Sequence, residues 1–276
     1  PTGGLLRTRE FVMKDLYSFH ATEEDLKAYY ERVKEAYVRI FERCGLQTVP
    51  VAAASGSIGG AVSHEFALLA ETGEDRVAQC PSCGYGAKVE ALGEAVTACP
   101  VCGHPLEVKR CIESGHIFQL GQTYSKKFDA TFVTESGARQ VLTMGCYGIG
   151  VGRLLAAIVE ASHDTLGIRW PSTVAPYDVH VIELGARAEG ATIRSATTRV
   201  TETLLRAGFH ILLDDRDGAS AGEKFADADL IGIPMRVVVS ERHVEKGSLG
   251  LKGRSEEAEQ AIQEDALIAA ISARAS

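Results

Sequence analysis

The clearest chemical pattern in the sequence is a set of four cysteines arranged as two C-x2-C pairs. Cys80 and Cys83 form the first pair, Cys99 and Cys102 form the second, and residues 84–98 lie between them. A glycine follows each pair, as in zinc knuckles whose four thiolates surround one ion tetrahedrally. Two disulfides would use the same residues, but a cytosolic protein rarely keeps disulfides. We therefore predict a structural zinc site with no open position for catalysis.

A second candidate site is the glycine-rich segment 145–153, G-C-Y-G-I-G-V-G-R, which runs into an apolar stretch typical of a buried helix. Glycines leave the backbone bare, and a helix N-terminus favours anions, so a phosphate group could lie here with Arg153 as a two-pronged donor. The spacing matches neither the phosphate loop G-x-x-x-x-G-K-[ST] nor the dinucleotide fingerprint G-x-G-x-x-G. Close packing of a strand on a helix would explain the glycines equally well.

Residues 7–19, R-T-R-E-F-V-M-K-D-L-Y-S-F, alternate loosely and predict a strand. A cation, an aromatic ring and a carboxylate would then share one surface, which suits a purine triphosphate and an amine-bearing substrate. For this segment alone, a solvated strand face is the simpler interpretation, and only its combination with the glycine-rich segment favours a substrate site. The side chains that would project from one face are Arg7, Arg9, Phe11, Met13, Asp15 and Tyr17.

Together these segments resemble the class II aminoacyl-tRNA synthetases, and most closely the bacterial prolyl-tRNA synthetases. Residues 7–19 resemble the second half of motif 2, and T-M-G-C-Y-G-I-G-V-G-R at 143–153 resembles motif 3. Three further segments are similar to the prolyl enzymes and follow in the family's order: G-S-I-G-G-A-V-S-H-E-F at 56–66, G-H-I-F-Q-L-G at 115–121 and W-P-S-T-V-A-P at 170–176.

The resemblance implies a two-step reaction, in which ATP activates L-proline to prolyl-adenylate and the prolyl group then passes to tRNA(Pro). Proline's carboxylate is ionised at neutral pH, so activation needs no general base, and positioning and charge neutralisation do most of the catalysis. Mg2+ would bridge the phosphate oxygens. By motif, Arg7 and Arg153 would be catalytic, and the ATP site would comprise Arg7, Phe11, Gln119, Gly150, Gly152 and Arg153. The proline pocket would comprise Met13, Asp15, Glu65, His116, Phe118 and Cys146.

Plainer interpretations of these residues stay open. Asp15 and Glu65 could be solvated charges, His116 could be a hydrogen-bonded core residue, and Cys146 could be simple packing. Only membership in the motifs favours the substrate pocket.

The strand and helix patterns predict an α+β fold. A helix should start near Thr22 and end at Gly45. Successive strand-like runs after it, the last over residues 140–144, indicate an antiparallel sheet. We expect a partial class II catalytic core over residues 1–170, with a zinc-knuckle insertion at about 79–109. Beyond the connector, strands alternate with helices, with a last helix from Glu256, which predicts an α/β domain over 177–276.

In the resembling family the second domain reads the anticodon. Arg216, Lys224 and Arg254 are the candidate tRNA contacts in this chain. Acidic residues outnumber basic ones there, and D-D-R-D at 214–217 is equally typical of a solvated turn. The formal net charge of −8 argues against a broad polyanion-binding surface, so any RNA contact must be local, and no DNA partner is expected. We find no membrane-length apolar run and no signal peptide, which favours a cytoplasmic protein.

The sequence departs from the family at its start, because it opens within the segment that resembles motif 2. We therefore expect a fragment of a longer, homodimeric enzyme, with a free sheet edge and little prolyl-adenylate formation by this chain alone. Residues 79–109 are short where many bacterial relatives carry an editing insertion, so hydrolysis of mischarged alanyl-tRNA is not expected. The alternative is a non-catalytic synthetase-like paralogue that binds tRNA or a protein partner.

Overall fold

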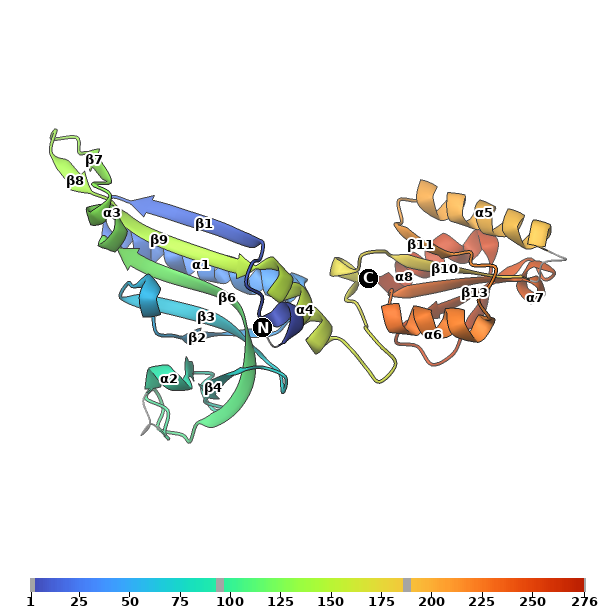
Figure 1. The fold of residues 1–276 in the computed structure, drawn as a ribbon, viewed down its shortest axis with the longest axis horizontal. Coiled ribbons are helices and arrows are strands. Elements are labelled where there is room, and N and C mark those ends of the chain that lie inside the picture. Colours follow the sequence, from blue (N-terminus) through green and yellow to red (C-terminus); the bar gives the residue numbers. More distant parts are fainter. Residues whose placement is uncertain (1–2, 93–96, 186–189, 276) are drawn as a thin grey trace. The chain divides into compact units, whose positions relative to one another are not determined.

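The computed structural model describes residues 3–92, 97–185 and 190–275. The chain divides into two compact units, Pro1–Ala161 and Ser162–Ser276, each built around its own sheet (Figure 1). The indole N–H of Trp170 donates to the carbonyl of Ile231 at 2.9 Å, so the segment that leads up to Trp170 packs with the second unit. Within the described part of the chain, no helix has the length and apolar character needed to cross a membrane.

The sheet of the first unit is antiparallel almost throughout, which confirms the expected α+β class. Its order is β1-β9-β6-β3-β2-β5-β4, and among the described pairs only β2 and β5 run parallel. The long strand β6 curves, so that its first part pairs with β4 and its last part with β9 (Figure 1). The strands are β1 (Met13–His20), β2 (Thr48–Ala52), β3 (Val62–Leu69), β4 (Asp75–Gln79), β5 (Gly86–Lys88), β6 (Glu107–Gly121) and β9 (Thr143–Gly150).

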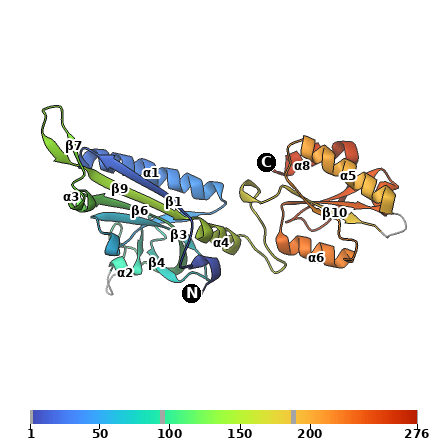
Figure 2. The same cartoon turned by 45° about the horizontal axis from the view of Figure 1, so that its top comes forward.

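Helix α1 (Glu23–Arg43) packs across one face of this sheet, as its apolar periodicity predicts (Figure 2). Thr22 caps it by accepting a hydrogen bond from the backbone N–H of Asp25 at 3.1 Å. The helix ends before Gly45, whose φ of 76° lies in the left-handed region that favours glycine. The ring of Phe41 lies 5.3 Å from that of Phe66 in β3. The buried helix face comprises Leu26, Tyr30, Val33, Tyr37 and Phe41.

The strand expected over residues 7–19 is shorter than predicted, because β1 begins only at Met13. Its partner β9 ends where helix α4 (Val151–Ala161) begins, and the backbone N–H of Val151 donates to the carbonyl of Val12 at 2.9 Å. After Gly150 the chain that paired with β1 becomes helix α4, so the described part of the chain offers residues 7–12 no strand partner there. They form a loop between a short turn, η1 (Gly4–Leu6), and β1.

The other elements of the first unit lie around the sheet. A strand expected over residues 140–144 is interrupted at Leu142, which separates the hairpin β7–β8 from β9. This hairpin extends beyond the end of the main sheet, next to α3 (Figure 2). The elements are η2 (Gly56–Ile58), α2 (Val89–Leu92), α3 (Thr123–Lys127), β7 (Thr131–Val133) and β8 (Arg139–Val141).

The second unit is the expected α/β domain. Its sheet has the order β11-β10-β12-β13-β14, in which β11, β10 and β12 are parallel, and α5 and α6 lie on opposite faces (Figure 1). Its core joins α5 and α8 to the sheet through residues such as Val200, Val237 and Ile271. The elements are η3 (Ser172–Val174), β10 (Val179–Leu184), α5 (Gly190–Arg206), β11 (Ile211–Asp214), α6 (Ala221–Ile231), β12 (Met235–Ser240) and α7 (Glu241–Val244).

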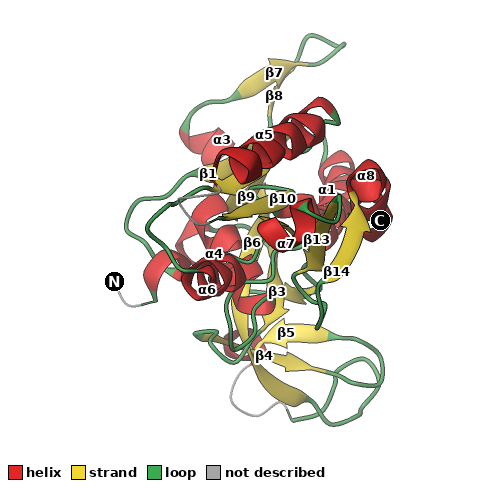
Figure 3. Cartoon of the chain, turned by 90° about the vertical axis from the view of Figure 1, so that its right-hand side faces the viewer, coloured by secondary structure: helices red, strands yellow, loops and turns green. Residues whose placement is uncertain are grey.

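The last helix does not begin at Glu256, as the sequence suggested. Strand β13 (Ser248–Gly253) is followed by β14 (Gln260–Gln263) and a turn, η4 (Glu264–Ala266), before α8 (Leu267–Ala275) starts. Figure 3 shows β13 and β14 as neighbouring strands. β14 is an edge strand with mostly exposed side chains, so it lacks the apolar alternation that would reveal a strand.

Candidate functional site

The two motif-like segments of the first unit lie side by side as paired strands. In the antiparallel ladder of β1 and β9, Met13 is opposite Gly150 and Tyr17 is opposite Cys146. On its other side, β9 pairs with β6, where Phe118 is also opposite Cys146. Three segments that are far apart in the sequence therefore form one continuous surface.

Because side chains alternate along a strand, neighbouring residues of β1 point to opposite faces of the sheet. In β1, Lys14 points to α1, where its ammonium contacts the hydroxyl of Tyr37 at 2.7 Å. The neighbouring residues Met13, Asp15 and Tyr17 line a pocket instead. This is the shared face that the alternation of residues 7–19 predicted, although the strand itself accounts only for its second half.

The pocket has a volume of about 330 Å³ and gathers most of the predicted ATP and proline residues. Of the remaining predicted residues, Gln119 pairs with Gly145 in the ladder and Gly152 lies in the first turn of α4, and neither is among the residues lining this pocket. The lining comprises Leu5, Leu6, Thr8, Phe11, Met13, Asp15, Tyr17, Ile58, Glu113, Ser114, Gly115, His116, Phe118, Cys146, Gly148, Gly150 and Arg153.

The glycines of β9 serve two purposes. A Cβ on Gly148 would lie 3.2 Å from the sulfur of Met13, and one on Gly150 would lie 3.8 Å from the ring of Phe11. Both glycines line the pocket, and a side chain at either position would occupy part of it. Gly145 faces the opposite side, where a Cβ would lie 2.8 Å from the hydroxyl of Ser18. The close-packing interpretation therefore applies to Gly145, and the bare-backbone interpretation applies to the other two.

Arg153 lies in the first turn of α4 and is held by hydrogen bonds to Glu113 and Leu6. Its Nη1 donates to the Glu113 carboxylate at 2.8 Å, and its Nε donates to the carbonyl of Leu6 at 3.0 Å. Although burial opposes ionisation, the hydrogen bond from His116 and the charge of Arg153 lower the pKa of Glu113. The guanidinium is therefore oriented at the pocket rim by a fixed carboxylate.

His116 is packed against an aromatic ring and faces two carboxylates. Its imidazole stacks on Phe118 with the centroids 3.9 Å apart, and its Nδ1 lies 3.3 Å from Glu113 and 3.7 Å from Glu65. Burial and the charge of Glu113 raise the pKa of Glu65. His116 Nε2 is buried without a hydrogen-bond partner among the described residues, so a polar ligand atom would satisfy it.

Arg7 and Glu65 line a second pocket, of about 630 Å³, that adjoins the first. The two pockets share Leu6, Thr8, Glu113 and Arg153. Arg7 is exposed and its Nη1 contacts Glu74 at 2.8 Å, and it lines only the second pocket, whereas Phe11 lines only the first.

Several charged residues of the two pockets lie outside the site predicted from the sequence. Glu113, Glu74, Asp75 and Lys88 all line the second pocket. Glu113 had one available signal, because it lies two residues before the segment 115–121 that resembles the prolyl enzymes. The others come from β4, β5 and the turn before them, where no motif marks them.

Cys146 completes the apolar wall of the first pocket. Its thiol is half-buried, and burial and the nearby charge of Asp15 raise its pKa. It is therefore a neutral thiol suited to contact with an apolar ring rather than to nucleophilic chemistry.

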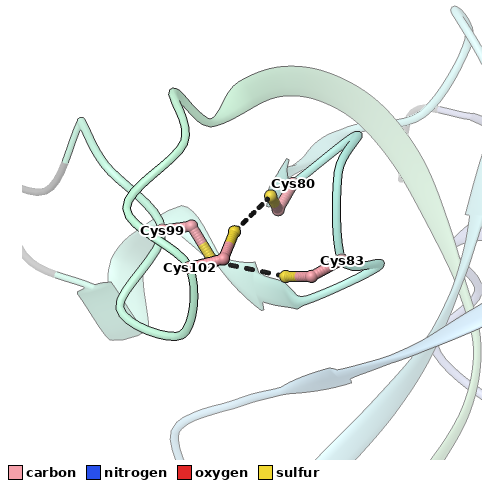
Figure 4. A group of neighbouring side chains, drawn as sticks. All are labelled: Cys80, Cys83, Cys99 and Cys102. Carbon is pink, nitrogen blue, oxygen red and sulfur yellow. Dashed lines mark hydrogen bonds between the residues drawn. The ribbon is translucent and has the colours of Figure 1, made fainter.

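The four predicted zinc ligands converge at the closed end of the β4–β5 hairpin (Figure 4). Their sulfur atoms all lie within 4.8 Å of one another, with Cys80 and Cys102 at 3.4 Å and Cys83 and Cys99 at 3.5 Å. Tetrahedral zinc with bonds of about 2.3 Å requires sulfur separations of about 3.8 Å. All four are free thiols, so the sulfur positions fit zinc and not the disulfide alternative.

Each C-x2-C pair has the same turn. The N–H of Gly84 donates to the carbonyl of Cys80 at 3.1 Å, and the N–H of Gly103 donates to that of Cys99 at 2.9 Å. Both glycines have a φ near 75°, at 74° and 75°, which explains why a glycine follows each pair. Burial alone would raise the pKa of Cys80, but hydrogen bonds from backbone amides lower it to about 7, which favours a thiolate.

The three candidate tRNA contacts of the second unit differ in exposure. Lys224 is only 4 % exposed and donates to two main-chain carbonyls at 2.8 and 3.3 Å. The side chain of Arg254 is also buried, and its guanidinium binds both carboxylate oxygens of Asp164 at 2.7 and 2.8 Å. Arg216 pairs with Asp214 at 2.7 Å but keeps about half of its side chain exposed. It is thus the candidate that an external phosphate could reach.

Comparison with known proteins agrees with both units. Residues 1–162 match the class II core domain of the tRNA synthetases for G, H, P, S and T, and residues 178–274 match an anticodon-binding domain. The chain is 42% identical over 249 residues to a probable mitochondrial proline–tRNA ligase of Rattus norvegicus, covering 89% of this chain and 52% of the relative. It is 42% identical over 272 residues to a probable mitochondrial proline–tRNA ligase of Schizosaccharomyces pombe, covering 97% and 63%.

A bacterial relative, the proline–tRNA ligase of Phenylobacterium zucineum, is 37% identical over 298 residues, which cover 99% of this chain and 67% of the relative. The chain thus spans between about half and two thirds of the length of these curated relatives. Its core fold, its anticodon-binding domain and its motif-bearing strands place it in the class II aminoacyl-tRNA synthetases, in the family of the proline–tRNA ligases.

Proposed function

We propose that this chain is the catalytic and anticodon-binding part of a proline–tRNA ligase, which activates L-proline with ATP and transfers the prolyl group to tRNA(Pro). The observation that carries this proposal is the pocket at which β1, β6, β9 and α4 meet. It places an exposed aromatic ring, an oriented guanidinium and an apolar wall within one volume.

ATP would occupy the end of the pocket formed by Phe11 and Arg153. The ring of Phe11 is about half exposed next to the bare backbone of Gly150, which leaves room for adenine to stack. Arg153 and Arg7 would hold the phosphates. Mg2+ would supply further charge neutralisation when it binds with ATP.

Proline would occupy the end formed by Phe118, Cys146 and Met13, whose side chains suit a saturated ring. Asp15 and Glu65 would face its secondary ammonium, and His116 would contribute a polar contact. In this arrangement the residues position the proline carboxylate against the α-phosphate, and no side chain has to remove a proton for activation.

The zinc knuckle and the second unit would have supporting and tRNA-binding roles. Zinc bound by the four thiolates would be structural, because all four positions are filled by protein. We propose Arg216 as the tRNA-facing residue, while Lys224 and Arg254 would act by holding the domain in shape. The outer strand β1 carries the exposed ring of Phe19, and Val12 just before the strand is also exposed, which supports a further strand or a second subunit at this edge in the complete enzyme.

Binding of a stable prolyl-adenylate analogue, a prolyl-sulfamoyl adenosine, tests this proposal by calorimetry. We expect tighter binding of the prolyl than of the alanyl analogue, and loss of affinity in Phe11→Ala. Equal affinity for both analogues, or none for either, would favour a non-catalytic paralogue. In the complete enzyme, proline-dependent pyrophosphate exchange is the corresponding activity assay.

A further inference from the structure

Lys88 is a buried cation beside the substrate pocket that lies outside the matched motifs. Its side chain is 10% exposed, and its Nζ lies 2.9 Å from a carboxylate oxygen of Glu65 and 2.9 Å from one of Asp75. Burial alone would lower the pKa of Lys88, but the hydrogen bonds to these two carboxylates raise it. The ammonium therefore stays charged and offers two fixed hydrogen bonds.

The two oxygens of Glu65 face different partners. Oε2 accepts from Lys88, while Oε1 points toward His116, whose Nδ1 is 3.7 Å away. Burial and the charge of Glu113 favour protonation of Glu65, and Lys88 acts in the opposite direction. Lys88 thus counteracts protonation of this carboxylate and binds Oε2, which leaves Oε1 directed toward His116.

The position of Lys88 depends on the hairpin that the cysteines close. In the β4–β5 ladder, Lys88 is opposite Val77, so Asp75 is its diagonal neighbour on the same face. Strand β5 is only three residues long and pairs with β2 through Ala87 alone. At the other end of the hairpin the N–H of Cys80 donates to the carbonyl of Tyr85 at 2.8 Å, directly within the first C-x2-C turn.

We propose that Lys88 is a positioning residue for the Glu65 carboxylate, and that the metal-bound cysteine knuckle holds Lys88 in place. This inference rests on the proposed function in one respect, namely that Glu65 faces the ammonium group of proline. The knuckle then has a role in substrate binding although none of its thiolates touches the substrate.

The first test follows the Glu65 carboxyl carbon by 13C NMR as a function of pH in the 276-residue chain. In Lys88→Met the pKa of Glu65 should rise above its wild-type value, because the compensating charge is lost, and Lys88→Arg should restore it. Lys109→Met is the matched control, because Lys109 is an exposed lysine on the neighbouring strand β6. If Lys88→Met does not fold, Lys88→Gln keeps a donor without the charge. An unchanged Glu65 titration in the uncharged variants would overturn the proposal.

The second test compares the zinc-loaded chain with the chain after metal removal under reducing conditions. Loss of the metal should shift the Glu65 titration toward that of Lys88→Met. If the chain takes up no zinc, or if the Glu65 titration is identical with and without metal, the knuckle does not hold Lys88.

The third test measures binding of the prolyl-adenylate analogue. Lys88→Met should raise its Kd about tenfold, the scale for residues coupled by direct contact, and should raise the Kd of ATP by less than that. In a Glu65→Gln background, Lys88→Met should have no further effect on the analogue, and an equal loss there would show that Lys88 acts independently of Glu65. If the wild-type chain fails to bind the analogue, the proposed function is wrong, whereas the Glu65 titration still decides the role of Lys88.

Discussion

Replacing Arg153 with alanine should weaken ATP binding more than it weakens the fold. A charged hydrogen bond to phosphate contributes about 1.5 to 3 kcal/mol, which corresponds to about 10- to 150-fold in Kd. Arg153 already donates to Glu113, so a phosphate must share or replace this partner, and we expect the lower end of the range, about tenfold. Arg153→Lys keeps the charge but loses the two-pronged guanidinium geometry. Its Kd for ATP should therefore lie between those of the wild type and Arg153→Ala.

Isothermal titration calorimetry with ATP and Mg2+ measures this effect, and thermal unfolding shows whether the variant is folded. Arg139→Ala is the control, because Arg139 is an exposed arginine on the β7–β8 hairpin, away from the pocket. A folded Arg153→Ala variant that binds ATP as tightly as the wild type would refute the phosphate role. The guanidinium would then serve only to hold Glu113, and the glycine-rich segment would be explained by packing.

The pH dependence of the same variant has a defined sign. The folded-state pKa of Glu113 is lowered, so its interactions stabilise the fold above its unfolded pKa, and this stability is lost as pH falls through the folded pKa. In Arg153→Ala the pKa of Glu113 should rise. Urea unfolding should therefore show the variant to be less stable than the wild type at pH 7, with the difference shrinking once Glu113 is protonated in both.

Three further predictions concern zinc, adenine stacking and tRNA. The reduced chain should bind one Zn2+ with sulfur ligands at about 2.3 Å, and Cys83→Ser should weaken that binding, as elemental analysis and X-ray absorption would show. Phe11→Ala should lower ATP affinity by about 1 to 3 kcal/mol without lowering the melting temperature, because the ring is about half exposed. Arg216→Ala should weaken tRNA binding in a salt-dependent manner, whereas Lys224→Met should lower the stability of the second unit, and equal loss of tRNA affinity with unchanged stability in both would contradict this assignment.

Local patterns were sufficient to predict the parts of the fold that depend on neighbouring residues. The apolar periodicity from Leu26 to Phe41 predicts a helix with a buried face, and the structure confirms it. The alternation of Met13, Asp15 and Tyr17 predicts a shared strand face, and the spacing of the cysteines predicts four converging sulfur atoms. In each case the period or the spacing alone determines which side chains meet.

The charged network of the pockets could not be predicted in this way. Arg7 and Glu74 are 67 positions apart, and Arg153 and Glu113 are 40 apart. Their meeting depends on the curvature of β6 and on the position of the β4–β5 hairpin, neither of which has a signature in a window of neighbouring residues. Edge strand β14 was mistaken for a helix for a related reason, since its exposed side chains carry no apolar period.

The arrangement of these charges explains how a chain with a net charge of −8 can offer a site for a triphosphate. Both proposed phosphate ligands are paired with glutamates, Arg7 with Glu74 and Arg153 with Glu113. Without ATP the carboxylates hold the guanidinium groups in place and limit their mutual repulsion. When a triphosphate arrives, its oxygens can take over hydrogen bonds that are already oriented, so little side-chain entropy is lost on binding. The acidic residues of the pocket are therefore compatible with anion binding, because they prepare the arginines for it.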